Sequence, residues 1–134
     1  MVWLEKQKLS PVVKPAITEE LLKKYAKASG DPNPIHLDSD FAKQAGFPSV
    51  IAHGMLSMAF LADCLCANFP ESEYRVAQFN TRFKKITFPG DVLTATGEIK
   101  QVQSDGSVSV SLWTENQKGE VTAQGEALVK LLTK

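Results

Sequence analysis

The chain contains two histidines, His36 and His53, and each lies among residues suited to chemistry. His36 ends the segment 30–36, Gly-Asp-Pro-Asn-Pro-Ile-His, in which two prolines restrict the loop that carries Asp31 and Asn33. A stiff loop of this kind can hold a carboxylate and an imidazole as a preorganised acid–base pair. The alternative is structural, because Asp-Pro and Asn-Pro are common turn sequences and Asp31 could simply form a hydrogen bond within the loop.

His53 and Gly54 stand at the start of the most apolar stretch of the chain. The first N–H groups of a helix have no partner within it and carry positive potential, so a helix beginning here could bind a developing oxyanion. Gly54 is small enough to let a substrate oxygen approach the backbone closely. Two structural alternatives stay open: the glycine permits tight packing, and His53 is a satisfied packing histidine.

Helices are expected in the first half of the chain. Thr18 can cap a helix whose first turn contains two glutamates, and Gly30 ends it. The segment 31–34 cannot continue this helix, because its two prolines lack an N–H and push the preceding residues into extended geometry.

Two more helices follow the proline-rich loop. A short one is capped by Asp38 or Ser39 and ends at Gly46. A longer one, from about 54 to 68, is apolar almost all round, so other structure must wrap it.

The second half of the chain predicts four antiparallel strands separated by turns. They cover about residues 75–87, 92–103, 107–116 and 120–132. A further short strand around 8–14 would lie at a sheet edge, because Pro11 has no N–H to donate to a neighbouring strand. The pattern predicts an α+β fold for one domain over residues 1–134: a hot-dog arrangement, in which an antiparallel sheet wraps around a long central apolar helix.

Composition and charge argue against several classes of protein. The 15 Lys and Arg balance the 15 Asp and Glu, which leaves no broad attraction to nucleic acid or anionic lipid. Cys64 and Cys66 would point in different directions on a helix, so neither a disulfide nor a metal site is expected. The apolar stretch 55–67 is shorter than the about 20 residues of a membrane-spanning helix. Residues 1–20 lack the apolar core of a secretory signal, so we expect a cytoplasmic protein.

The segment 29–38, Ser-Gly-Asp-Pro-Asn-Pro-Ile-His-Leu-Asp, strongly resembles the signature of the MaoC-like, (R)-specific enoyl-CoA hydratases. The resemblance continues through 51–55, Phe83-Lys84 and 88–91, and so spans nearly the whole chain. Members of this group are hot-dog domains that form dimers or fused pairs. The resemblance implies a hydro-lyase that reversibly hydrates trans-2-enoyl thioesters to (3R)-3-hydroxyacyl thioesters in fatty-acid metabolism.

Carried over residue by residue, the resemblance makes Asp31 and His36 the catalytic pair, Asn33 the residue that orients them, and Gly54 the oxyanion donor. It also implies a homodimer. No metal or redox cofactor is expected, and coenzyme A or the phosphopantetheine of an acyl carrier protein enters only as part of the substrate. The chain contains no P-loop and no dinucleotide-binding glycine fingerprint.

Three other functions stay open. A (3R)-hydroxyacyl-[acyl-carrier-protein] dehydratase would use the same chemistry on a different carrier. A hot-dog acyl thioesterase would direct water to the carbonyl carbon, and a non-catalytic acyl-thioester-binding subunit would not need the loop motif. Lys84 and Lys85, with Arg82 and Arg75, could meet the phosphates of coenzyme A or an acidic carrier protein, or could form a solvated strand face.

Overall fold

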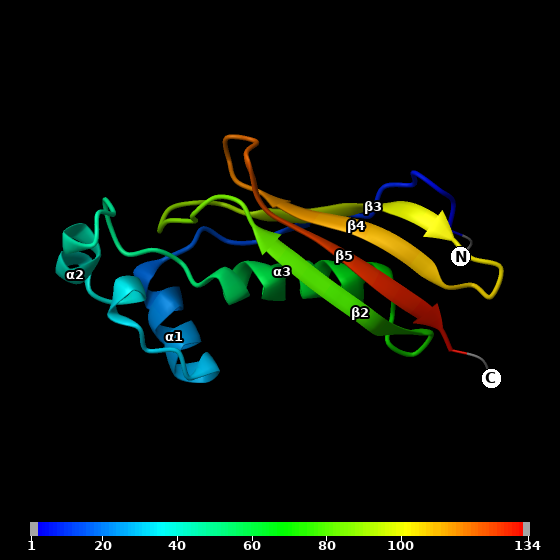
Figure 1. Ribbon diagram of the computed structural model, residues 1–134, viewed down its shortest axis with the longest axis horizontal. Helices are drawn as coiled ribbons and strands as arrows, with labels where there is room; N and C mark the ends of the chain where they lie inside the picture. Colours follow the sequence, from blue (N-terminus) through cyan, green and yellow to red (C-terminus); the bar gives the residue numbers. More distant parts are fainter. Residues whose placement is uncertain (1–2, 133–134) are drawn as a thin grey trace.

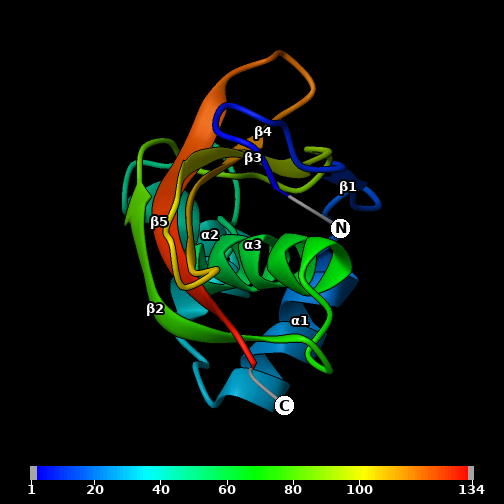
Figure 2. The same cartoon turned by 90° about the vertical axis from the view of Figure 1, so that its right-hand side faces the viewer.

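A five-stranded antiparallel sheet curves around one long helix in the computed structural model, which describes residues 3–132 (Figures 1 and 2). The sheet order is β1-β3-β4-β5-β2, and α3, Gly54–Asn68, lies on its concave side. The strands are β1 Val12–Val13, β2 Tyr74–Phe83, β3 Thr94–Val102, β4 Val108–Glu115 and β5 Val121–Leu131. This arrangement confirms the predicted α+β hot-dog fold.

Helix α1, Glu19–Ser29, begins and ends where its capping residues predict. The N–H of Leu21 donates to the Thr18 side chain, and Gly30 has the left-handed φ of 74° that glycine adopts without strain. The N–H of Asp31 donates to the carbonyl of Ala26 at 3.1 Å. The end of α1 therefore fixes where the proline-rich loop starts.

The proline-rich loop contains one turn of 3-10 helix, η1, over Pro34–His36. As predicted, residues 31–34 do not continue α1, and the separate turn can begin at Pro34 because a proline fits the first turn of a helix. Helix α2, Ser39–Gln44, follows and is capped by Asp38. Together α1, η1 and α2 form a layer beside the N-terminal end of α3 (Figure 1).

Helix α3 is less completely wrapped than its apolar sequence predicts. Leu61 and Cys64 are fully buried and Leu56 nearly so, but Met55 is 57% exposed and the side chains of Ala59 and Cys66 are also exposed. The sheet covers one side of the helix and leaves an apolar stripe on the other. Both cysteines are free thiols, as expected.

Strand β2 is shorter than predicted, because the chain leaves the sheet after Phe83. The N–H groups of Lys84 and Lys85 both donate to the Thr122 carbonyl, and the Thr87 carbonyl accepts from Ala52. Residues 84–87 therefore run beside the N-terminus of α3 instead of extending the strand.

The two edges of the sheet differ in length. The two-residue β1 forms one edge, as Pro11 predicts, and the ten-residue β2 forms the other. Within residues 3–132, no helix combines the length and the apolar character needed to cross a lipid bilayer.

Candidate active site

A cavity of ≈ 280 Å³ lies at the N-terminus of α3. Its walls include His36, His53, Gly54, Phe83 and Ile86. A larger hollow of ≈ 650 Å³ is lined by β2, β4 and β5, but neither histidine borders it. Because the chemically versatile side chains gather at the smaller cavity, we assign the candidate site there.

Asp31 and Asn33 shape the loop that leads to His36. An Asp31 carboxylate oxygen accepts a hydrogen bond from the Asn33 N–H at 3.3 Å, and Asn33 Oδ1 accepts from the Ile35 N–H at 3.1 Å. The second bond caps η1, whose last residue is His36. The bond to Asp31 is the hydrogen bond within the loop that the sequence analysis gave as the structural alternative. It uses one carboxylate oxygen, and the other oxygen can still accept a proton.

The ring of His36 is held in place through one of its nitrogens. His36 Nδ1 lies 2.7 Å from the carbonyl oxygen of Ile51, and a carbonyl only accepts, so Nδ1 carries the proton. Nε2 is then the nitrogen that can exchange a proton with a ligand in the cavity.

His53 contacts both Asp31 and His36, the two candidate catalytic residues. Its ring stacks on that of His36 with centroids 3.7 Å apart, and its Nε2 donates to the Asp31 carbonyl at 3.1 Å. Tyr25 packs edge-on against the same ring, at 4.9 Å. Burial, together with the nearby Asp31 charge, raises the pKa of Tyr25 above its ordinary value.

Asp31, His36 and His53 each have one side-chain atom that could ligate a metal ion, and these three atoms lie within 4.8 Å of one another. A shared metal ion would have to lie about 2.1 Å from both imidazole nitrogens and in both ring planes. Rings stacked at 3.7 Å with 23° between their planes do not present their lone pairs to one such point. The cluster is therefore suited to proton transfer rather than to metal binding.

Gly54 is the first residue of α3, and the helix has no side-chain cap. Its N–H has no acceptor among the described residues, so it is available to an oxygen in the cavity. A Cβ at this position would lie 3.2 Å from the Phe83 ring. The structure thus supports both readings of Gly54: a backbone donor beside the cavity and a close contact with an aromatic ring.

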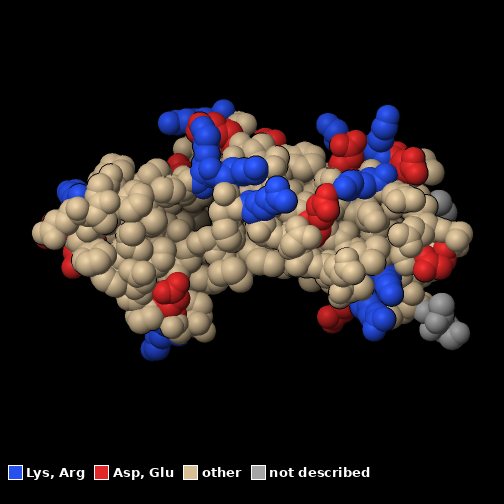
Figure 3. Space-filling view, viewed as in Figure 1, with Lys and Arg blue, Asp and Glu red and all other residues tan. Residues whose placement is uncertain are grey.

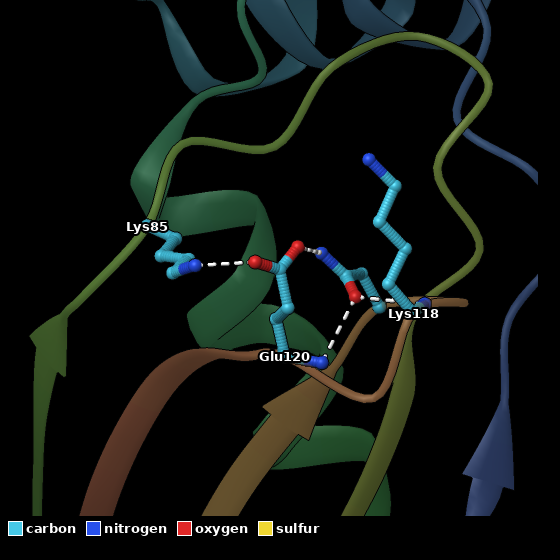
Figure 4. A network of polar contacts seen from close by, with 4 residues as sticks. Lys85, Lys118 and Glu120 are labelled. Atoms are coloured by element: carbon cyan, nitrogen blue, oxygen red, sulfur yellow. Dashed lines mark hydrogen bonds and ion pairs between the residues drawn. The ribbon is translucent and has the colours of Figure 1, made fainter.

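Basic residues border the cavity on the side of β2 and β5. Lys84 and Lys85 line it, and in the space-filling view basic side chains gather beside a hollow over the middle of the visible face (Figure 3). The Glu120 carboxylate pairs with Lys85 and accepts from the Asn116 amide, whereas the Lys118 ammonium points away from this network (Figure 4). No ion pair involving Lys84 occurs within residues 3–132.

Comparison with known proteins agrees with this geometry. Residues 4–122 match the family described as MaoC like domain. The chain belongs to this family. The resemblance recognised in its sequence is thereby confirmed.

Several relatives of this MaoC-like chain are named hydratases or dehydratases. It is 34% identical to the (R)-specific enoyl-CoA hydratase of Aeromonas caviae, over 80% of this chain and 81% of that protein. It is 35% identical to 3-hydroxyacyl-thioester dehydratase X of Mycobacterium tuberculosis over 72% of this chain, but spans only 31% of that protein. The solved structure of an (R)-hydratase from Pseudomonas aeruginosa superposes with a TM-score of 0.88 and 29% identity, covering 98% of this chain and 84% of that one.

Of the four predicted site residues, His36 and Gly54 line the cavity, Asp31 lies within 4.8 Å of His36, and neither Asp31 nor Asn33 lines the cavity. Asp31, Asn33 and His36 share one loop, and Gly54 borders the same cavity as His36. Their catalytic roles stay predictions. His53 was singled out by its rarity, but nothing in the sequence indicated that its ring would stack on His36.

Proposed function

We propose that this MaoC-like protein is an (R)-specific enoyl-CoA hydratase, which reversibly adds water to trans-2-enoyl thioesters to form (3R)-3-hydroxyacyl thioesters. One observation carries the proposal: His36 and the uncapped N-terminus of α3 border one partly apolar cavity, and the Asp31 carboxylate lies within 4.8 Å of His36. Base, acid and oxyanion donor are the three groups that the reaction requires.

The reaction proceeds by attack of water on Cβ of the conjugated thioester. Asp31 takes a proton from the water as its oxygen bonds to Cβ, and His36 Nε2 helps to hold that water. The electron pair of the double bond moves toward the thioester oxygen, where the Gly54 N–H stabilises the enolate. A proton from the Asp31–His36 pair then goes to Cα, and the reverse sequence removes water.

The identity of the carrier separates the leading function from its alternative. Lys84 lines the cavity and forms no ion pair within residues 3–132, so its ammonium is free to meet a phosphate of coenzyme A there. The same ammonium could meet an acidic carrier protein, and a coenzyme A thioester is the carrier that we propose. A (3R)-hydroxyacyl-[acyl-carrier-protein] dehydratase would run the same chemistry on a carrier protein.

A panel of enoyl thioesters tests the proposed function. With trans-2-enoyl-CoA substrates of several lengths, we expect the conjugated absorbance to fall without release of free thiol. Thiol release with the conjugation retained would identify a thioesterase instead. Activity only on acyl-carrier-protein substrates would identify the dehydratase, and binding without turnover would identify a non-catalytic subunit.

We also propose a homodimer in which β2 pairs with β2 of a second copy to extend the sheet. Strand β2 is a free ten-residue edge with mostly exposed side chains, including Val76 at 47% and Phe83 at 52%. The unpaired edge of β2 and the exposed apolar stripe of α3 both favour burial against a partner. In a two-fold symmetric dimer, the β2 edge of one copy pairs with the β2 edge of the other, and the two α3 stripes cover one another.

Light scattering at micromolar concentration tests this dimer, and we expect twice the mass of one chain. Val76→Lys places a charge at the proposed interface and should shift the mass toward the monomer. A monomeric parent protein would refute the pairing.

The proposed reaction requires no metal, nicotinamide or flavin, since proton transfer and one backbone donor suffice. Treatment with a chelator should therefore leave the rate unchanged.

A cytoplasmic location is part of the same proposal, because an exposed free thiol such as Cys66 is suited to a reducing compartment.

A further inference from the structure

We propose that His53 is a positioning residue that aligns Asp31 and His36 for reaction while its own ring stays neutral. The kinetic test of this role rests on the proposed function, whereas the contacts of His53 that support it do not depend on that function. His53 borders the cavity but is only 2% exposed, so little of its ring is open to water or to a ligand. Its contacts instead join the two candidate catalytic residues.

The first contact places Asp31. The imidazole Nε2 of His53 donates to the backbone carbonyl of Asp31 at 3.1 Å, and His53 itself stands immediately before the rigid helix α3. The neighbouring Ala52 N–H is bonded to Thr87 at 2.8 Å, which fixes the backbone on the other side. The Asp31 loop, which is otherwise exposed, is thereby tied to the same helix end that presents the Gly54 N–H.

The second contact places His36. The two imidazole rings stack at 3.7 Å and 23°, and the edge of Tyr25 supports His53 from α1. Because the Ile51 carbonyl fixes His36 Nδ1 and the His53 ring supports its face, the His36 ring has one orientation. A displacement of a reacting group by about 1 Å can lower the rate of a reaction by about 100-fold.

The contacts of His53 also determine its protonation state. Since Nε2 carries the proton given to Asp31, Nδ1 bears a lone pair, and this nitrogen is buried with no partner within residues 3–132. Burial lowers the pKa of His53, and His36 lowers it further, against the opposing effects of the Asp31 carbonyl and carboxylate. A neutral ring beneath His36 lets His36 carry a proton during catalysis without a second cation stacked on it.

Two substitutions separate the two contacts. His53→Phe keeps a ring beneath His36 but removes the donor to Asp31, and His53→Gln keeps a donor but removes the ring. We expect each to lower kcat about 10- to 100-fold while KM changes less than about threefold, because His53 acts on the reacting groups rather than on the carrier. In a His36→Asn background, His53→Gln should cost much less than it does alone, because the two rings act together.

Phe69→Leu is the control for general destabilisation. Phe69 is a buried aromatic at the far end of α3, packed against Trp3 and Tyr74. It should leave kcat nearly unchanged. The proposal is wrong if both folded His53 variants keep kcat within about threefold of the parent, or if Phe69→Leu loses as much as they do.

Nitrogen NMR of the imidazoles tests the arrangement without any turnover. The chain has two histidines, so two ring spectra are expected, and His53→Gln assigns them. We expect His53 in the Nε2–H form with a pKa below the ordinary value of about 6.5. We also expect the ring-current shift of His36 to vanish in His53→Gln but persist in His53→Phe.

A His53 ring in the Nδ1–H form, or an unchanged His36 spectrum in His53→Gln, would overturn the inference even in an active hydratase. Conversely, a parent protein without hydratase activity but with these spectra would refute the proposed function and leave the alignment intact.

Discussion

Replacing Asp31 by Asn, or His36 by Asn, should lower kcat for hydration by roughly 10²- to 10⁴-fold while the fold is retained. Asp31→Asn keeps an oxygen that accepts from the Asn33 N–H, and His36→Asn keeps an N–H that can donate to the Ile51 carbonyl. Each substitution therefore removes proton transfer and preserves the loop contact. The double variant should lose less than the sum of the two losses, as expected for residues that act as a unit.

The matched control for this pair is Asp40→Asn. Asp40 is an exposed carboxylate in α2, and its replacement makes the same change of charge close to the loop without touching the cavity. It should leave kcat unchanged. If a folded Asp31 or His36 variant keeps near-normal turnover, that residue is only a loop contact.

Replacing Gly54 by Pro should lower kcat on the order of 10²- to 10³-fold, which is the usual loss for one oxyanion donor. Proline removes the N–H but suits the first position of a helix. The residue before it must be extended, and His53 already has φ −63° and ψ 134°. The substitution thus removes the donor without requiring a new backbone conformation, although the proline Cβ would lie 3.2 Å from the Phe83 ring.

Gly54→Ala keeps the N–H and is the natural control, but its Cβ would press on the Phe83 ring at 3.2 Å. We therefore expect a clean comparison in a Phe83→Leu background, where the smaller side chain relieves the contact. There the Ala variant should be active and the Pro variant nearly inactive. Equal, large losses would mean that Gly54 serves close packing and not donation.

Local chemistry explains why the sequence predicted the helices well. Thr18 and Gly30 bound α1, Asp38 caps α2, and the apolar run coincides with α3. These signals act within a few residues, so they can be recognised without the rest of the fold. The end of β2 was not predictable in the same way, because it depends on bonds from residues 84 and 85 to Thr122, far along the chain.

The exposed side of α3 also differs from the prediction, for a second physical reason. An apolar sequence indicates that a surface must be buried but not which molecule buries it, so the helix was expected to be wrapped on all sides, whereas its residue Met55 is 57% exposed in one chain. The same limit applies to the site. Motif residues Asp31, Asn33 and His36 could be found in one loop, whereas the stacking of His36 on His53 arises only from tertiary structure.

The configuration of the product tests the central claim most directly. Chelator-treated protein is incubated with a short trans-2-enoyl-CoA, and the 3-hydroxyacyl product is resolved by chiral chromatography. Attack of a water fixed by Asp31 and His36 on one face of the substrate predicts a single enantiomer, and the proposed (R)-specific activity makes it the (3R) alcohol, with coenzyme A still attached. The (3S) alcohol, a racemic mixture or no alcohol would contradict the account.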